Sequence, residues 1–345
     1  MPGVSDLVRS DPGVPGIGRR RCGRGFRYLG PDGAAVRDRG TIARIRALVI
    51  PPAWQDVWIC PDPAGHIQAT GTDAAGRRQY RYHDLWREQR DQQKHDRMLE
   101  FGAALPRLRE VIGRHLGGRG LVRQRVLAAA VQLINLGFFR PGGEEYAAGN
   151  GSFGLATIRR DQVSVSRGQI VFTYTGKGAR QQEQAVAEGQ VCAVVRSLKR
   201  RRGGGRLLAY RRGSCWHDVT ATDINDYLRE VSGGEFTAKD FRTWHATVLA
   251  AVGLAVSEGA DTAAARRRAI ARVCQEVASY LGNTPAVARA SYIDPRVISL
   301  YEEGRTIAAS LAGLGKENTF GGLATAGHAE RAVLKLLAAA PAPGE

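Results

Sequence analysis

Residues 281–292 read LGNTPAVARASY, and this stretch decides how the last third of the chain folds. Gly282 is a typical residue just beyond the end of a helix, and Thr284 followed by Pro285 is a typical helix start. The stretch therefore predicts a helix that ends at Gly282 and a short second helix that carries Tyr292. A tyrosine hydroxyl can attack a phosphodiester only where nearby cations neutralise the phosphate and the charge that builds on it.

The whole chain is rich in such cations. It has 345 residues, with 50 lysines and arginines against 33 acidic residues and a formal net charge of +17. This balance favours a polyanionic partner, and nucleic acid is the expected one. A chain of this length predicts two domains.

The sequence also limits where the protein acts. It has no long apolar run and no apolar leader, so we expect no membrane contact and a cytoplasmic protein. The five cysteines are scattered, without the close pairs that mark zinc or redox motifs, so we expect them to be reduced.

The first part of the chain is predicted to be a small β-rich domain. Turn signals such as Pro31-Asp32-Gly33 punctuate it. The alternation of residue types predicts one helix over residues 41–48 and strands over residues 25–29, 55–60, 66–70 and 77–82.

From about residue 84 the pattern becomes helical. The second domain is predicted to be mainly α-helical with one small antiparallel sheet, a three-stranded meander over residues 154–184 and the only strand block predicted there. The chain as a whole is therefore predicted to be α+β.

Thr237 and Asp240 predict a capping box. Helices are predicted over residues 84–101, 106–116, 121–136, 222–231, 238–256, 261–281 and 328–340, with Val122, Val126, Ala130 and Leu133 on the apolar face of the third.

Taken singly, the candidate functional residues have ordinary structural explanations. Arg140 ends an apolar helix, where a cation is favourable in any case. Lys177 lies between two glycines and would usually be a solvated lysine at a hairpin tip, although such a lysine can also donate a proton to a leaving oxygen. Arg242 would usually be a surface arginine, Asn283 a loop residue and Tyr292 a core residue.

The order and sequence context of these five residues are more informative than any one of them. Arg140 lies in FRPGGEEY (139–146), which is followed by NGSFGLAT (150–157), and Arg242 lies in KDFRTW (239–244). These motifs resemble those of the type IB DNA topoisomerases. The resemblance also includes Lys177 at the hairpin, the spacing of Asn283 and Tyr292, and the segments PPAW (51–54) and GRRQYRY (76–82) near the start. The compact bacterial and poxviral members are the most similar.

The resemblance implies a mechanism and roles for the five residues. Tyr292 would attack a DNA phosphodiester, form a 3′-phosphotyrosyl bond and free a 5′-hydroxyl, without ATP, metal or cofactor. Rotation of the cut strand would relax supercoils of both signs. Arg140 and Arg242 would contact the nonbridging oxygens, Asn283 would donate one more hydrogen bond, and Lys177 would be the general acid.

The resemblance also implies how DNA is held. Domains of residues 1–88 and 89–345 would form a clamp around duplex DNA. The protein would act as a monomer in the cytoplasm, associated with the nucleoid, and would need no obligate protein partner. The basic runs 199–202 and 266–268 are expected to be solvated and to attract DNA diffusely. DNA contacts are implied for Gln79, Tyr80, Tyr82, Tyr146 and Lys239.

Two positions depart from the family. Asn283 stands where many members have histidine, and an amide can donate a hydrogen bond but cannot titrate. Gly143, Glu144 and Glu145 replace a more basic pattern of the poxviral relatives, so a preference for particular cleavage sites is not carried over.

Three other functions stay open at this point. A tyrosine recombinase would use the same chemistry, but such enzymes usually have histidine where this chain has Lys239, and a helical amino-terminal clamp. A noncatalytic DNA-binding protein could retain the scaffold alone. A metal-dependent nuclease would need a carboxylate cluster, and the sequence contains no convincing one.

Overall fold

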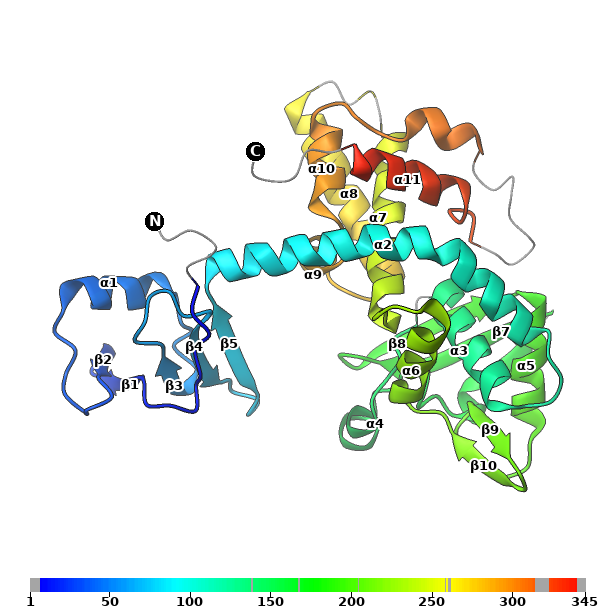
Figure 1. The fold of residues 1–345 in the computed structure, drawn as a ribbon, viewed down its shortest axis with the longest axis horizontal. Coiled ribbons are helices and arrows are strands. Elements are labelled where there is room, and N and C mark those ends of the chain that lie inside the picture. The colour runs from blue at the N-terminus through cyan, green and yellow to red at the C-terminus, as the bar shows by residue number, and fades with distance from the viewer. Residues whose placement is uncertain are drawn as a thin grey trace. The chain divides into compact units, whose positions relative to one another are not determined.

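The computed structural model describes residues 7–137, 139–166, 168–203, 205–257, 259, 262–313 and 323–339. The chain divides into two compact units, Met1–Asp96 and Arg97–Glu345, and has the predicted α+β character (Figure 1). The long helix α2 (Asp84–Leu116) runs through this division. The domain boundary predicted between residues 88 and 89 also falls within α2, and it stays a prediction.

The first unit is built on a five-stranded antiparallel sheet with the strand order β2-β1-β3-β4-β5. Its small core consists of Ile17, Val57, Ile59 and Ala69 from the sheet and Ile45 from the helix. The elements are β1 (Ile17–Cys22), β2 (Gly25–Leu29), α1 (Arg39–Ala47), β3 (Gln55–Ile59), β4 (Ile67–Thr72) and β5 (Arg78–Tyr82).

Strand β1 is the element of this unit that was not predicted. Its sequence, IGRRRC, contains three consecutive arginines and lacks the apolar alternation of a strand. Arg19 is nevertheless well accommodated, because its guanidinium lies 4.2 Å from the centre of the Phe26 ring and donates to the carbonyls of Ile50 and Trp54.

Helix α2 corrects the prediction of two separate helices over residues 84–101 and 106–116. Pro106 lies inside one continuous helix, where it cannot donate to the carbonyl of Gly102. Buried residues on both sides of it, including Phe101 and Leu108, belong to one core, and their burial keeps the helix continuous. Gly102 is required for this packing, since a Cβ there would lie 2.6 Å from the Trp244 ring.

The second unit is mainly helical, as predicted. Val122 is an exception to the expected apolar face, because it precedes the third helix and is 50% exposed. The helices are α3 (Arg123–Gly137), α4 (Glu144–Asn150), α5 (Gly189–Arg200), α6 (Ala221–Ser232), α7 (Ala238–Val256), α8 (Ala263–Leu281), α9 (Pro285–Ser291), α10 (Pro295–Glu302) and α11 (His328–Ala338).

The predicted meander is present as β6 (Val163–Ser166), β7 (Gln169–Gly176) and β8 (Arg180–Val186), paired in that order. A second sheet, the hairpin of β9 (Ala209–Arg212) and β10 (Cys215–Asp218), was not predicted. Ala209 is buried and Tyr210 is half-buried, but residues 211–218 are all exposed, so burial imposes little apolar alternation on these strands.

The basic run 199–202 is only partly the solvated face that the sequence predicts, because Arg200 and Arg202 are exposed but Lys199 and Arg201 are not. Arg201 is buried and donates to the carbonyl of Gly203, while its guanidinium lies 5.3 Å from the centre of the Trp216 ring. Lys199 donates to the carbonyl of Arg160. These two cations therefore stabilise the fold.

Two further expectations concern the environment of the chain. Its five cysteines are all free, and Cys22 and Cys215 are exposed. Across the described residues, we find no helix with the length and apolarity that a membrane span requires.

Candidate active site

Tyr292 lies where the sequence predicts to within one residue, just after the short helix that was expected to carry it. Helix α8 ends at Gly282, whose left-handed backbone (φ 61°) suits glycine, and the hydroxyl of Thr284 accepts from the N–H of Val287 to begin α9. Tyr292 directly follows α9, and its carbonyl accepts from the hydroxyl of Thr247 on α7 at 3.3 Å. The turn and this hydrogen bond hold the half-buried Tyr292 beside α7.

Arg242 lies on α7 and is only 3% exposed. Its guanidinium donates to the carbonyl of Leu281 at 2.7 Å, which ties it to the end of α8. The guanidinium carbon also lies 5.4 Å from the centre of the Tyr292 ring. A buried cation is thus directed at the predicted nucleophile.

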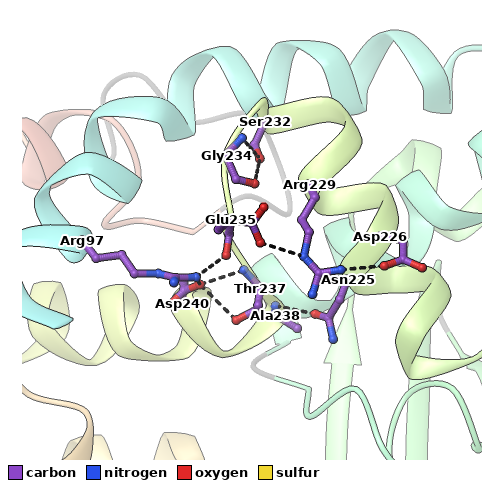
Figure 2. A network of polar contacts seen from close by, with 10 residues as sticks. All are labelled: Arg97, Asn225, Asp226, Arg229, Ser232, Gly234, Glu235, Thr237, Ala238 and Asp240. Carbon is purple, nitrogen blue, oxygen red and sulfur yellow. Dashed lines mark hydrogen bonds and ion pairs between the residues drawn. The ribbon is translucent and has the colours of Figure 1, made fainter. Parts of the chain in front are cut away.

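The first turn of α7 is fixed by a polar network (Figure 2). The Asp240 carboxylate accepts from the backbone N–H of Thr237 at 2.7 Å, as the capping box predicts, and from Arg97 at 2.8 Å. The side chain of Asn225 accepts from the N–H of Ala238 at 3.0 Å. Because Arg242 follows Asp240 by two residues, these contacts determine where its backbone lies.

Arg140 comes from the loop between α3 and α4. Its guanidinium donates to Oδ1 of Asn283 at 2.6 Å and lies 3.3 Å and 3.4 Å from the carbonyl oxygens of Gly282 and Leu281. Both predicted arginines therefore bind the same turn before Tyr292. Since Oδ1 of Asn283 accepts from Arg140, the amide nitrogen of Asn283 remains as a donor.

The Arg140 loop is held by an unusually close approach of two backbone segments. The carbonyl of Arg140 accepts from the N–H of Leu155 at 2.8 Å, and that of Pro141 accepts from the N–H of Ala156 at 2.8 Å. Gly142 and Gly154 meet where these segments cross, and a Cβ on Gly154 would lie 2.6 Å from the nitrogen of Gly142. The glycines in this predicted motif thus allow the Arg140 loop to close.

Lys177 lies at the tip of the β7–β8 hairpin and is exposed. The turn needs left-handed backbone at Gly178 (φ 78°) and Ala179 (φ 57°). Arg180, just beyond it, donates to the carbonyl of Asn283 at 3.3 Å. The hairpin is therefore attached to the same turn as the two arginines.

A small pocket brings these elements together. Arg140, Lys177 and Arg242 line it, and so do Tyr174, Gln182 and Gln184, which were not predicted from the sequence. The only signal for Tyr174 was its place among the inward-facing residues of β7, which did not distinguish it from a core residue.

Tyr174 and Tyr292 respond oppositely to the same cations. Burial raises the pKa of Tyr174 to about 12, although the charges of Arg140 and Arg242 oppose this. Burial also acts to raise the pKa of Tyr292, but the charge of Arg242, a hydrogen bond from Arg242 and the charge of Arg140 outweigh it and lower the pKa. Tyr292 is therefore the phenol of this site that ionises more easily.

Burial lowers the pKa of Arg242 to about 10, and the charge of Arg140 acts in the same direction. Arg242 nevertheless remains charged at neutral pH. The site thus holds two arginines bonded to the turn before Tyr292, an ionisable phenol, and a lysine on the adjacent hairpin.

Comparisons with known proteins agree with this arrangement. Residues 83–312 match the family model of the eukaryotic DNA topoisomerase I catalytic core, and residues 25–73 match that of the bacterial DNA topoisomerase IB N-terminal domain. The chain belongs to the type IB DNA topoisomerases. A DNA topoisomerase 1B of Acanthamoeba polyphaga mimivirus is 31% identical over 299 residues, which cover 84% of this chain and 88% of the viral protein. The resemblance seen in the sequence is confirmed, and the chain is a DNA topoisomerase.

The predicted DNA contacts of this topoisomerase lie in both units. Tyr80 and Tyr82 are exposed on the same face of β5, with their rings stacked 6.0 Å apart. Gln79 points to the other face, where it donates to Asp73 at 2.9 Å. Lys239 is exposed in the first turn of α7. The backbone of Tyr146 lies in α4, and its side chain is outside the described part.

Proposed function

We propose that this topoisomerase relaxes positive and negative supercoils by cutting and resealing one DNA strand, without ATP or a metal ion. The hydroxyl of Tyr292 loses its proton to water, its oxygen forms a bond to the scissile phosphorus, and the bond from phosphorus to the 5′-oxygen breaks. The strand is then held through a 3′-phosphotyrosyl bond while it rotates about its partner. Because one phosphodiester replaces another, the step needs no external energy source.

Each of the other four residues has one task in this mechanism. Arg140 and Arg242 bind the nonbridging oxygens and balance the charge of the pentacoordinate transition state. Asn283 donates a hydrogen bond to the same group. Lys177 gives a proton to the departing 5′-oxygen and takes it back when that hydroxyl attacks the phosphotyrosine.

The observation that carries the proposal is the position of Arg242 over Tyr292. The 5.4 Å separation places a buried, charged guanidinium beside the phenol. The pocket next to it is lined by the other two cations that the reaction requires, Arg140 and Lys177. This arrangement supports attack by Tyr292 on a phosphate bound between the arginines.

We propose further that the two domains, residues 1–88 and 89–345, enclose duplex DNA and act as a monomer in the cytoplasm. The exposed, stacked pair Tyr80 and Tyr82 offers flat apolar surface to DNA. Gln79 and Tyr146 complete these contacts, and Lys239 provides a charge near the phosphates. The net charge of +17 favours association with DNA over its whole length.

The deciding experiment compares the native chain with Tyr292→Phe on negatively and positively supercoiled plasmid, in EDTA and without ATP. We expect the native chain to relax both plasmids and Tyr292→Phe to bind them without relaxing either. Denaturation of the native reaction should leave protein covalently attached to the 3′ end of the cut strand. A requirement for a metal ion, relaxation by Tyr292→Phe, or attachment to the 5′ end would each contradict the mechanism.

A further inference from the structure

Tyr174 is a second phenol in the pocket of the three cations. It lies on β7 and is 6% exposed, and its ring stacks on Phe139 with the ring centres 6.1 Å apart. Its side chain lines the pocket together with Arg140 and Arg242. The charges of both arginines act to lower the pKa of its hydroxyl, against the larger effect of burial. It is therefore placed where the mechanism puts the phosphate.

Packing alone does not account for a hydroxyl at this position. The contact with Phe139 requires the ring, and a phenylalanine would make it equally well. A buried hydroxyl costs stability unless it is hydrogen-bonded. The bond found for it within the described residues runs to Oε1 of Gln184 at 3.4 Å, which is long for a hydroxyl donor.

We propose that Tyr174 is a further catalytic residue, whose hydroxyl donates a hydrogen bond to a nonbridging oxygen of the scissile phosphate. This inference rests on the proposed attack by Tyr292 on a phosphate in this pocket. The phosphate oxygen carries charge and is the stronger acceptor, so the Tyr174 hydroxyl exchanges its long bond to Gln184 for a bond to the phosphate.

Tyr174 acts only as a donor and transfers no proton. Because burial raises its pKa to about 12, the hydroxyl stays protonated beside Arg140 and Arg242 at neutral pH. Tyr292, whose pKa is lowered, is the phenol that loses its proton. A neutral donor also adds no positive charge to a pocket that already holds three cations.

The test is Tyr174→Phe, which keeps the ring and removes only the hydroxyl. In single-turnover cleavage of a DNA duplex, we expect the rate to fall about 10- to 100-fold, as for a lost hydrogen bond to a charged group, while the affinity for DNA is unchanged. A rate equal to that of the native chain would overturn the proposal.

A second readout separates a contact with the phosphate from a structural effect. In a methylphosphonate linkage at the cleavage site, a methyl group replaces one nonbridging oxygen, and the two stereoisomers differ in which one. We expect the penalty of Tyr174→Phe to disappear for the isomer that lacks the contacted oxygen and to persist for the other. An equal penalty on both isomers would show that the hydroxyl acts through the fold, and would also overturn the proposal.

The matched control is Tyr227→Phe. Tyr227 is also a buried phenol whose pKa burial raises, but its hydroxyl is hydrogen-bonded to His115 at 2.7 Å, on helices that do not line the pocket. Its cleavage rate should equal the native rate, and a matching loss would mean that any buried hydroxyl has this effect. Failure of the proposed function would give a different result. In that case the native protein would not cleave the duplex, or Tyr292→Phe would still cleave it.

Discussion

The guanidinium carbon of Arg242 lies 5.4 Å from the centre of the Tyr292 ring, and the same guanidinium donates to the carbonyl of Leu281 at 2.7 Å. One buried arginine thus joins the nucleophile to the end of α8. Its charge and hydrogen bond lower the pKa of Tyr292 against the opposing effect of burial. Tyr292 is held in place and made easier to ionise by the same side chain.

Replacing Arg242 by lysine tests this double role. Lysine keeps the charge but lacks the planar pair of donors, so we expect cleavage to slow by about 100- to 1,000-fold. Cleavage should also need a higher pH, because the pKa of Tyr292 rises when the hydrogen bond from Arg242 is lost. Single-turnover rates between pH 6 and 10 measure both effects. Arg272→Lys, on the exposed face of α8, should match the native profile, and an unshifted profile for Arg242→Lys would contradict the role in ionisation.

Lys177→Ala tests the general acid. Lys177 is exposed at the hairpin tip, so its loss should leave the fold intact and slow cleavage by about 100-fold or more. A substrate with sulfur in place of the 5′-oxygen has a leaving group that needs no proton, and it should restore the rate. The same substrate should not rescue Arg242→Lys, which lacks a phosphate ligand instead. If Lys177→Ala stays slow on the sulfur substrate, Lys177 is not the acid.

Gly154→Ala tests how the Arg140 loop is held. The added Cβ would lie 2.6 Å from the nitrogen of Gly142 and 2.9 Å from the carbonyl oxygen of Arg140, and both are backbone atoms that cannot turn aside. We expect a loss of about 1–3 kcal/mol in the free energy of unfolding and a larger fractional loss of cleavage, because Arg140 moves. Gly149→Ala on α4 meets no atom within 4 Å and should change neither. Normal cleavage by Gly154→Ala would show that the close approach is not needed.

Local signals predicted much of the fold around the site. Gly282 and the Thr284-Pro285 pair gave the end of α8 and the start of α9, and Thr237 with Asp240 gave the first turn of α7, because each acts through its own neighbouring backbone. The family resemblance, carried by the motifs around Arg140 and Arg242, supplied the candidate residues that the structure brings together.

Features that depend on distant contacts were not predictable in this way. Pro106 normally marks a helix boundary, and only the shared core on both sides of it keeps α2 continuous. Half of strand β1 is arginine, and the partners that stabilise Arg19 come from later parts of the chain. The sequence pattern predicts only that Tyr174 faces inward from its strand, and the pocket shows that it shares a lining with Arg140 and Arg242.

Asp240→Ala tests the network at the start of α7. The change removes the acceptor of Thr237 and Arg97 in a side chain that is almost fully buried. We expect a loss of about 2 kcal/mol in the free energy of unfolding, measured with urea. The control is Asp226→Ala, which breaks an exposed pair with Arg229 and should cost less than about 0.5 kcal/mol. Equal losses for the two variants would show that the network does not fix α7.

His245 predicts how stability depends on pH. It lies on α7, is 2% exposed, and its Nε2 lies 3.1 Å from Oδ1 of Asn135. Burial lowers its pKa to about 4, with Glu330 opposing and Arg109 assisting this shift. The unfolded chain therefore binds a proton between pH 6.5 and 4 that the folded chain does not. The free energy of unfolding is therefore unaffected by the titration of His245 above about pH 6.5, and it falls as the pH is lowered from 6.5 toward 4.

The expected size of this effect is a fall of about 2 kcal/mol in the free energy of unfolding between pH 7 and 5. Urea unfolding of the native chain and of His245→Asn at both pH values measures it. Asparagine cannot titrate, so the variant should be less stable at pH 7 but should lose about 2 kcal/mol less than the native chain on acidification. The pKa of Glu330 is lowered in the fold, so its contribution to the free energy of unfolding is lost only below about pH 4.5. Glu330 therefore does not account for a difference between the two proteins between pH 7 and 5. Parallel losses in both proteins would mean that His245 is not held neutral in the fold.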